Sequence, residues 1–327
     1  MRIRPCTPAD YAAIIAVQQR AATDAQGLPI VPMTVEELIQ ADRDRPTHVA
    51  FGRWVAEAGG EIIGWAEHDQ TSYRFHPRRF WLDGYVDPAH QRAGVGGALY
   101  THVMAALAPF DPLTVRNAVR EDMLAGLAFL AARGWREQQR TWLSELDPAA
   151  FDPAPFAATA AAVEARGIVI RTLPELADDR DRDRKLYELV WEIRQDLPDL
   201  DAPTKEPYEE YRALRLHHRD LPPDAYFVAV DRNAFVGLLY HRVDASEPHV
   251  LQIAQLGVAR AYRGRGVAVA LKLRGNAYAR ERGYAVVRTG NESANHAIVH
   301  INERMGFVRS HAYLHLVKTL ASEADAG

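Results

Sequence analysis

Apolar residues recur at two different periods along the chain, and the two periods together predict a mixed α/β protein. Runs rich in valine, isoleucine and aromatic residues predict strands; they include 49–56, 62–67, 80–86, 226–230, 235–242 and 251–258. Apolar residues three or four positions apart predict helices, as at Val95, Leu99, Val103 and Leu107. Short turns within 59–60 and 231–233 predict two hairpins.

The predicted elements follow the order β-α-α-β-β-β-α-β-α-β, and this order occurs twice. The first series fills residues 1–148 and the second fills 167–321. An alanine-rich connector with one amphipathic helix, 149–166, joins them, and 322–327 is expected to be a disordered tail. Because 327 residues suffice for two domains of ordinary size, the chain is predicted to hold two domains.

One stretch, 251–271, combines a strand, a basic turn and a helix. Backbone N–H groups at a helix start lack partners within the helix, and the helix dipole favours negative charge there. Gly264 and Gly266 permit close approach to the backbone, and Arg263 and Arg265 add positive charge. The turn is therefore predicted to bind an anion, typically a phosphate.

The same pattern occurs 172 residues earlier in the chain, where Gly94 corresponds to Gly266. Other pairs at this offset are Val86 and Val258, Ala89 and Ala261, Val95 and Val267, Leu99 and Leu271, Arg116 and Arg288, and Trp135 and Phe307. One short match can arise by chance, but a constant offset over this length indicates an internal duplication. We call the two halves the N-terminal and C-terminal copies.

Both turns resemble the Gln/Arg-x-x-Gly-x-Gly/Ala signature of the GCN5-related N-acetyltransferase (GNAT) family. They are Gln91-x-x-Gly94-x-Gly96 and Arg263-x-x-Gly266-x-Ala268, and Asn295 followed by Gly306-Phe307 resembles the family's second signature. The resemblance covers nearly the whole chain as two tandem copies. It implies two GNAT folds, each a mixed, mostly antiparallel central sheet flanked by helices.

The resemblance also implies that acetyl-CoA is the co-substrate and that no metal takes part. Its pantetheine arm would lie along the strand before each turn, on the backbone of Leu256, Gly257 and Val258 or of Gly84, Tyr85 and Val86. Its pyrophosphate would bind the turn itself. The implied residues are Arg263, Gly264, Arg265, Gly266, Val267, Ala268 and Val269, and in the N-terminal copy Gln91, Arg92, Ala93, Gly94, Val95, Gly96 and Gly97.

Other interpretations of the turns are weaker. A Walker-type phosphate loop needs Gly-Lys-Ser/Thr, which neither turn has, and a dinucleotide fingerprint needs G-x-G-x-x-G, which neither turn completes. Two glycine-rich turns that bind nothing remain the alternative.

The acid that would protonate the leaving thiolate is missing from its usual place. The family usually has a tyrosine four residues before the Gly-Phe glycine, where this chain has Asn302 and Leu130. Tyr262 is a candidate substitute. Asn295 and Asn291 are expected to contact CoA, and helix capping is their structural alternative. Their counterparts in the N-terminal copy are Met123 and Val119, so only the C-terminal copy has this polar set.

A general base is harder to assign. Asp83 is the best carboxylate on the central strand of the N-terminal copy, whereas the C-terminal copy has Gln252 and Gln255 there. Three further carboxylates, in or after an acidic loop, are candidates that are also typical of a solvated surface: Asp199, Asp201 and Glu209.

Composition narrows the classes of function. A net charge of −4 gives no support to binding of nucleic acid or of an anionic membrane, and no apolar run approaches a membrane span. The single cysteine, Cys6, excludes an internal disulfide and fits a reducing, cytoplasmic compartment. His296 and His300 are four residues apart, but no third ligand accompanies them, so no metal site is predicted.

The sequence therefore predicts a tandem acetyl-CoA-dependent N-acyltransferase that acts on an amine of a small molecule or peptide. The C-terminal copy is expected to be catalytic and the N-terminal copy degenerate. A non-catalytic acyl-CoA-binding protein is the alternative, and a third hypothesis places the reaction in the N-terminal copy through Asp83. The acceptor and the oligomeric state stay open.

Overall fold

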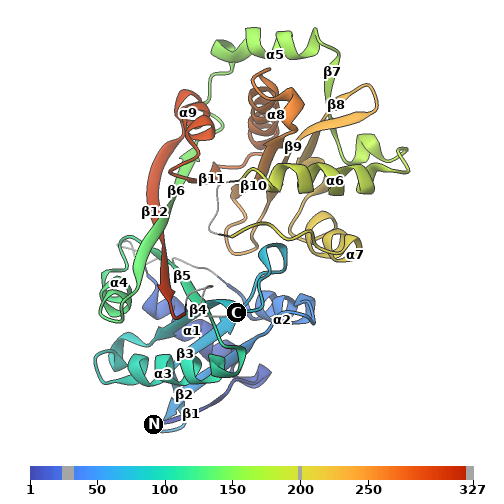
Figure 1. Cartoon of the computed structure of the whole chain (residues 1–327). Helices are drawn as coiled ribbons and strands as arrows, with labels where there is room; N and C mark the ends of the chain where they lie inside the picture. The colour runs from blue at the N-terminus through green and yellow to red at the C-terminus, as the bar shows by residue number, and fades with distance from the viewer. Residues whose placement is uncertain (24–32, 198–200, 322–327) are drawn as a thin grey trace. The chain divides into compact units, whose positions relative to one another are not determined.

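A computed structural model describes residues 1–23, 33–197 and 201–321 (Figure 1). The chain divides into two compact units, each described here by itself. The first unit contains Met1–Arg140 and Tyr313–Gly327, and the second contains Thr141–Ala312. Asp199 and the predicted tail, 322–327, lie outside the described residues.

The first unit is a sheet in the order β1-β2-β3-β4-β5-β12 with helices packed on it (Figure 1). Its elements are β1 (Arg2–Pro5), α1 (Tyr11–Ala21), α2 (Val35–Asp44), β2 (Gly52–Ala58), β3 (Glu61–Asp69), β4 (Arg79–Val86), α3 (Val95–Leu107), β5 (Thr114–Arg120), α4 (Leu124–Ala131) and part of β12 (Val308–Thr319). Strands β4 and β5 are parallel, and the β1-β2-β3-β4 and β5-β12 pairings are antiparallel. A capping box begins α2, because Thr34 and Glu37 exchange hydrogen bonds.

The second unit repeats this plan in the order β6-β11-β10-β9-β8-β7. Its elements are part of β6 (Arg136–Leu146), α5 (Ala157–Glu164), β7 (Ile168–Thr172), α6 (Arg182–Arg194), α7 (Tyr208–Tyr211), β8 (Tyr226–Asp231), β9 (Ala234–Arg242), β10 (Val250–Val258), α8 (Val267–Glu281), β11 (Val286–Glu292) and α9 (His296–Arg304). Strands β10 and β11 are the parallel pair here. The short α7 is followed directly by a π-helical turn, Arg212–Leu216.

Element boundaries confirm the duplication at an offset of 172. Helices α3 and α8 begin at Val95 and Val267, and helices α4 and α9 begin at Leu124 and His296. Strands β5 and β11 begin at Thr114 and Val286, and β6 and β12 begin at Arg136 and Val308. The element order predicted for each copy is also present in both.

The last strand of each copy pairs in the sheet that the other copy begins. Residues 141–146 of β6 pair with β11, and residues 313–319 of β12 pair with β5. The compact units therefore differ in composition from the sequence ranges 1–148 and 167–321. The ranges 1–148 and 167–321 describe the two copies of the duplicated sequence and stay a prediction as domain bounds. Sequence periodicity does not show which strand the last strand of a copy will pair with.

The sheet of the second unit separates two apolar cores. On one face, Leu239, Leu251 and Leu271 belong to a core that includes α8. On the other face, Leu238 and Tyr240 belong to a core that includes α6. Because neighbouring residues of a strand point to opposite faces, β9 contributes to both cores, and any side chain on β9 or β10 can be assigned to a face.

Candidate functional site

The parallel strands of the second unit separate before they end. Strands β10 and β11 pair only from Val250 with Val286 to Ile253 with Thr289. Beyond that point, β10 pairs with β9 on one side, and β11 pairs with β6. In the described residues, the backbone of Leu256, Gly257 and Val258 therefore has no strand partner on the β11 side, so the three predicted pantetheine residues lie together at an open strand edge.

The first unit has the same split. Strands β4 and β5 pair from Arg79 with Thr114 to Trp81 with Arg116. Gly84, Tyr85 and Val86 then continue only alongside β3. Gly84 also packs tightly, since a Cβ at this position would lie 2.6 Å from the Trp65 carbonyl oxygen. Both copies thus have an open strand edge directly before the glycine turn.

The two anion turns have the same backbone geometry. Gly94 and Gly266 have φ values of 88° and 85°, in the left-handed region that favours glycine, and each precedes the first residue of a long helix. The side chain at the start of each turn folds back in the same way. Gln91 donates to the Val86 carbonyl over 3.1 Å, and Arg263 donates to the corresponding Val258 carbonyl over 3.0 Å.

Much of the positive charge at the C-terminal turn is already paired. The guanidinium groups of Arg260 and Arg263 each lie 2.7 Å from the Asp196 carboxylate. Arg263 therefore shapes the turn, whereas Arg265 lies over the Tyr262 ring and pairs with no carboxylate among the described residues. The anion-binding groups that stay available are the helix N–H groups and Arg265.

The Tyr262 hydroxyl is engaged with a carboxylate. It donates to Asp231 over 2.7 Å, and this hydrogen bond raises the pKa of Tyr262. Since its proton is held by a carboxylate at the hairpin of β8 and β9, the geometry gives no support to the predicted acid role. Because Tyr262 and Asp231 are far apart in the sequence, this contact could not be predicted from the sequence.

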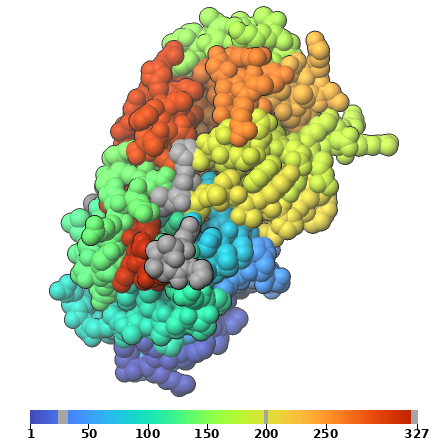
Figure 2. Space-filling view, viewed as in Figure 1, coloured from blue at the N-terminus to red at the C-terminus, as the bar shows by residue number. Residues whose placement is uncertain are grey.

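The connector helix α5 is more than a linker. It lies on the surface beside α8 (Figure 2), where Thr159 packs against Gly266. A Cβ on Gly266 would lie 2.6 Å from the Thr159 Cγ2, and Arg166 donates to the Arg265 carbonyl over 3.0 Å. Gly266 is thus required both by its backbone conformation and by this close contact.

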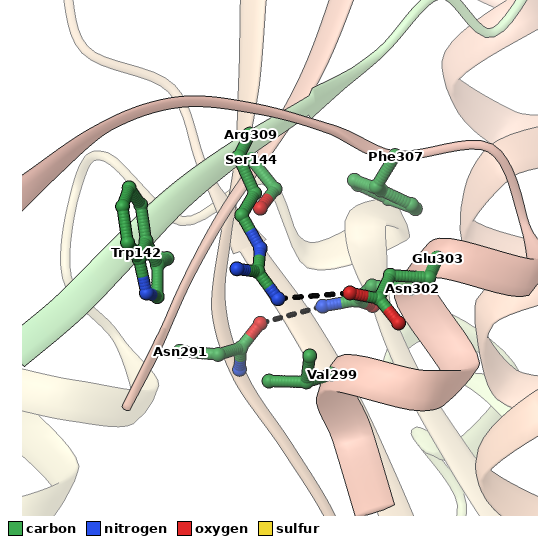
Figure 3. Close-up of a pocket in the computed structure, with 8 residues that line it drawn as sticks. All are labelled: Trp142, Ser144, Asn291, Val299, Asn302, Glu303, Phe307 and Arg309. Carbon is green, nitrogen blue, oxygen red and sulfur yellow. Dashed lines mark hydrogen bonds and ion pairs between the residues drawn. The ribbon is translucent and has the colours of Figure 1, made fainter. Parts of the chain in front are cut away.

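Two asparagines meet beside the split in a recess of the second unit. Asn302, on α9, is 4% exposed and donates to the Asn291 side-chain oxygen over 2.6 Å (Figure 3). The Asn302 side-chain oxygen is buried and has no hydrogen-bond partner. The other residues that line the recess are Trp142, Ser144, Val299, Glu303, Phe307 and Arg309. A buried, unpaired acceptor is costly, so it suits a ligand that brings an N–H group.

Asn295 stands at the N-cap of α9 but makes no side-chain capping bond, so the capping alternative is not realised there. The N-terminal copy has no equivalent polar set. Val119 and Leu130, which correspond to Asn291 and Asn302, are buried apolar residues at 7% and 8% exposure. The amide recess is therefore a feature of the C-terminal copy.

The N-terminal copy instead places carboxylates beside its split. Asp83, on β4, lies directly opposite Glu67, on β3, and Glu67 pairs with Arg53 over 2.6 Å. Although solvent reaches Asp83, the protein around its carboxylate raises its pKa to about 6. Burial raises the pKa of Glu67 to about 7, against the opposing effect of Arg53. Asp83 is thus a carboxylate that can exchange a proton near neutral pH.

Glu209, one of the carboxylates predicted in or after the acidic loop, is exposed and pairs with Arg212 over 3.1 Å. Across the described ranges, 1–23, 33–197 and 201–321, no three metal-ligating side chains cluster, and no helix is long and apolar enough to cross a membrane.

Comparison with known proteins agrees with this geometry. The acetyltransferase (GNAT) family model matches residues 22–135 and 184–307. The chain is 28% identical to a mycothiol acetyltransferase of Nocardia farcinica over 79% of each chain, and 30% identical to N-alpha-acetyltransferase 30 of Schizosaccharomyces pombe over 37% of this chain and 79% of that protein.

Two solved structures share the fold over nearly the full chain. A tandem GNAT protein from the clavulanic acid biosynthesis pathway has a TM-score of 0.75 at 20% identity and covers 98% of this chain and 99% of its own. A GCN5-related N-acetyltransferase from Sphaerobacter thermophilus has a TM-score of 0.70 at 22% identity and covers 98% and 96%. The chain belongs to the GNAT acetyltransferase family, as an acyltransferase built from two tandem copies of the family fold.

Proposed function

We propose that the protein transfers the acetyl group of acetyl-CoA to an amine of a small molecule or peptide, and that the C-terminal copy carries the reaction. The observation that carries the proposal is the amide recess. It lies beside the open strand split and occurs only in the C-terminal copy. The split and the anion turn occur in both copies and so support CoA binding in general. They do not by themselves distinguish the copies.

Each part of the C-terminal site has a role in holding the co-substrate. The N–H groups that begin α8 bind the pyrophosphate, and Arg265 adds a positive charge that no carboxylate neutralises. The open edge of Leu256 to Val258 pairs with the amide groups of the pantetheine arm. The unpaired oxygen of Asn302 accepts from an N–H of that arm, a role that fits its geometry better than thiolate protonation.

The transfer itself forms a C–N bond and breaks the thioester C–S bond. The backbone N–H groups at the split stabilise negative charge on the carbonyl oxygen. The amine must lose one proton and CoA leaves as the thiolate. The amine reacts in its neutral form, and the proton that it loses passes to solvent.

A matched pair of charge changes tests the assignment. Gly264 and Arg92 occupy the same turn position, with φ values of 71° and 62°. We expect Gly264→Asp to weaken CoA binding by roughly tenfold to a hundredfold, because a carboxylate is added where a phosphate binds. Calorimetry measures binding, and thiol release over a panel of amines measures transfer. If Arg92→Asp, rather than Gly264→Asp, abolishes transfer, the reaction belongs to the N-terminal copy.

A reaction in the N-terminal copy is the second candidate, and Asp83 favours it. A carboxylate with a pKa of about 6 at a strand split is a suitable general base. Loss of all transfer in Asp83→Asn, with CoA binding unchanged, would support this candidate. If CoA binds to both turns and no amine in the panel is acetylated, the acyl-CoA-binding alternative takes precedence.

A further inference from the structure

Three side chains form a row across the central strands of the second unit. Tyr226 on β8 lies opposite Tyr240 on β9, and Tyr240 lies opposite Gln255 on β10. Tyr240 belongs to the core that includes α6, as does Tyr226, so the row lies on the face opposite α8. We call these three residues the neutral row.

The N-terminal copy has a charged row at the same place. Arg53 on β2 lies opposite Glu67 on β3, and Glu67 lies opposite Asp83 on β4. The equivalence follows from two glycines that face the first turn of the following helix. A Cβ on Gly64 would touch Val95 and Leu99, and one on Gly237 would touch Val267 and Leu271.

Glu67 and Tyr240 each follow that glycine by three residues, so they are equivalent although their offset is 173. Asp83 and Gln255 correspond at the offset of 172. An ion pair and a carboxylate in one copy are thus replaced by two phenols and an amide in the other. The two copies present different chemistry to whatever reaches their splits.

The neutral row is ordered and incompletely hydrogen-bonded. The Tyr226 and Tyr240 rings stack with centroids 4.9 Å apart, and these residues are 1% and 6% exposed. The Tyr240 hydroxyl donates to the Gln255 side-chain oxygen over 3.4 Å, which directs the Gln255 Nε2 away from the phenol. That Nε2 is buried and has no partner. A donor left in this state costs about 1–3 kcal/mol unless a ligand or water completes it.

Gln255 lies at the point where β10 and β11 separate. Its strand shifts register between Ile253 and Gln255, immediately after the last pair with β11. The anion turn begins α8 on one face of the sheet, whereas the neutral row occupies the opposite face. An acetyl group presented at the split from the α8 side is therefore reached by an amine from the side of Gln255.

Charge near the row is balanced. The nearest cation on α6, Arg194, pairs with the buried Glu206 over 2.7 Å. The row itself contains no ionised group at neutral pH, since burial raises the pKa of Tyr226 well above its usual value. A polycationic amine would find no anionic partner in the row, and burying an unpaired charge is strongly unfavourable.

We propose that the neutral row binds the acceptor of the C-terminal copy, and that this acceptor is an uncharged amine carrying a neighbouring hydroxyl, ether or carbonyl oxygen. Gln255 Nε2 donates to that oxygen, and Tyr240 positions the amide. The amine nitrogen forms the new C–N bond, its proton passes to solvent, and CoA leaves as the thiolate. The inference rests on the proposed acetyl transfer and specifies its substrate class.

The test compares two kinds of acceptor by kcat/KM. Glucosamine and glycinamide carry the required oxygen, and putrescine is a dication without one. We expect the unaltered protein to prefer the first two. Gln255→Met should lower kcat/KM for them by about tenfold, as expected for one lost hydrogen bond. Gln255→Glu should reduce or reverse the preference over putrescine, because it restores the charge of the N-terminal row. Tyr240→Phe should raise KM with a smaller change in kcat.

Calorimetry of CoA binding accompanies every variant and reports whether the fold and the co-substrate site survive. Transfer with an unchanged preference in both Gln255 variants would overturn the inference while leaving the proposed function intact. CoA binding without transfer to any amine would instead overturn the proposed function. If kcat/KM rises with pH only as the acceptor ammonium loses its proton, the result supports the inference. A further inflection in the pH profile of kcat/KM that disappears in Asp83→Asn contradicts it.

Discussion

A buried lysine gives the sharpest test of the energetics of the second unit. Lys272, on α8, is 1% exposed, and its ammonium lies 4.2 Å from the centre of the Phe307 ring. No carboxylate pairs with it in the described part of the chain, and burial lowers its pKa to about 7. The corresponding residue of the N-terminal copy is Tyr100. The fold therefore does not require a cation here.

The cost follows from proton linkage. Lysine in an unfolded chain has a pKa of about 10.4, so the folded state binds its proton more weakly by some three units. At about 1.4 kcal/mol per unit, the penalty approaches ~4 kcal/mol at pH 7 as an upper value. Because the folded pKa is depressed, the free energy of unfolding is lowest below pH 7 and rises as the pH increases toward 10.

We expect Lys272→Met to raise the free energy of unfolding at pH 7 by about 2 kcal/mol or more, since methionine fills a similar volume without a charge. Urea denaturation between pH 6 and 9.5 measures it. The gap between the variant and the unaltered protein should narrow steadily across this range, and buried tyrosines affect both proteins alike. A variant that is less stable at pH 7, or a gap that does not change with pH, would refute the reasoning.

Two further substitutions test individual contacts. Arg53→Met leaves Glu67 and Asp42 without the guanidinium that lies 2.6 Å and 2.9 Å from them, and should cost about 3 kcal/mol in chemical denaturation at pH 8. The loss should shrink at pH 6, where Glu67 takes up a proton, and an equal loss at both pH values would contradict this account. Tyr262→Phe should cost about 1 kcal/mol of stability and leave acetyl transfer unchanged; a large fall in kcat would restore its role as an acid.

Local features of the fold were predictable because a few neighbouring residues determine them. A glycine with positive φ before an apolar helix, as at Gly94 and Gly266, is visible in any sequence that contains it. The duplication was visible because its offset is constant from Val86 to Trp135. Both signals are patterns of residue types, which can be recognised without knowing which segments are in contact.

Contacts between distant segments were not predictable. Thr159 packs against Gly266, and Tyr262 donates a hydrogen bond to Asp231. Nothing in the types of these residues indicates that they are in contact. The neutral row was hidden for a specific reason, because one residue fewer separates Tyr240 from Gln255 than separates Glu67 from Asp83, so Tyr240 does not follow the constant offset. Only the strand registers reveal which side chains lie opposite one another.

The exchange of final strands also governs when the protein can fold during synthesis. The sheet of the first unit needs residues 313–319 beside β5, and these are made only after residues 141–312 of the second unit. Until then β5 presents an unpaired edge, the feature by which partly folded chains associate wrongly. When residues 1–148 have been synthesised, the N-terminal copy is therefore complete in sequence, but its sheet still lacks β12. The sheet of the first unit therefore cannot be completed until the second unit has been synthesised, which links the folding of the two duplicated halves.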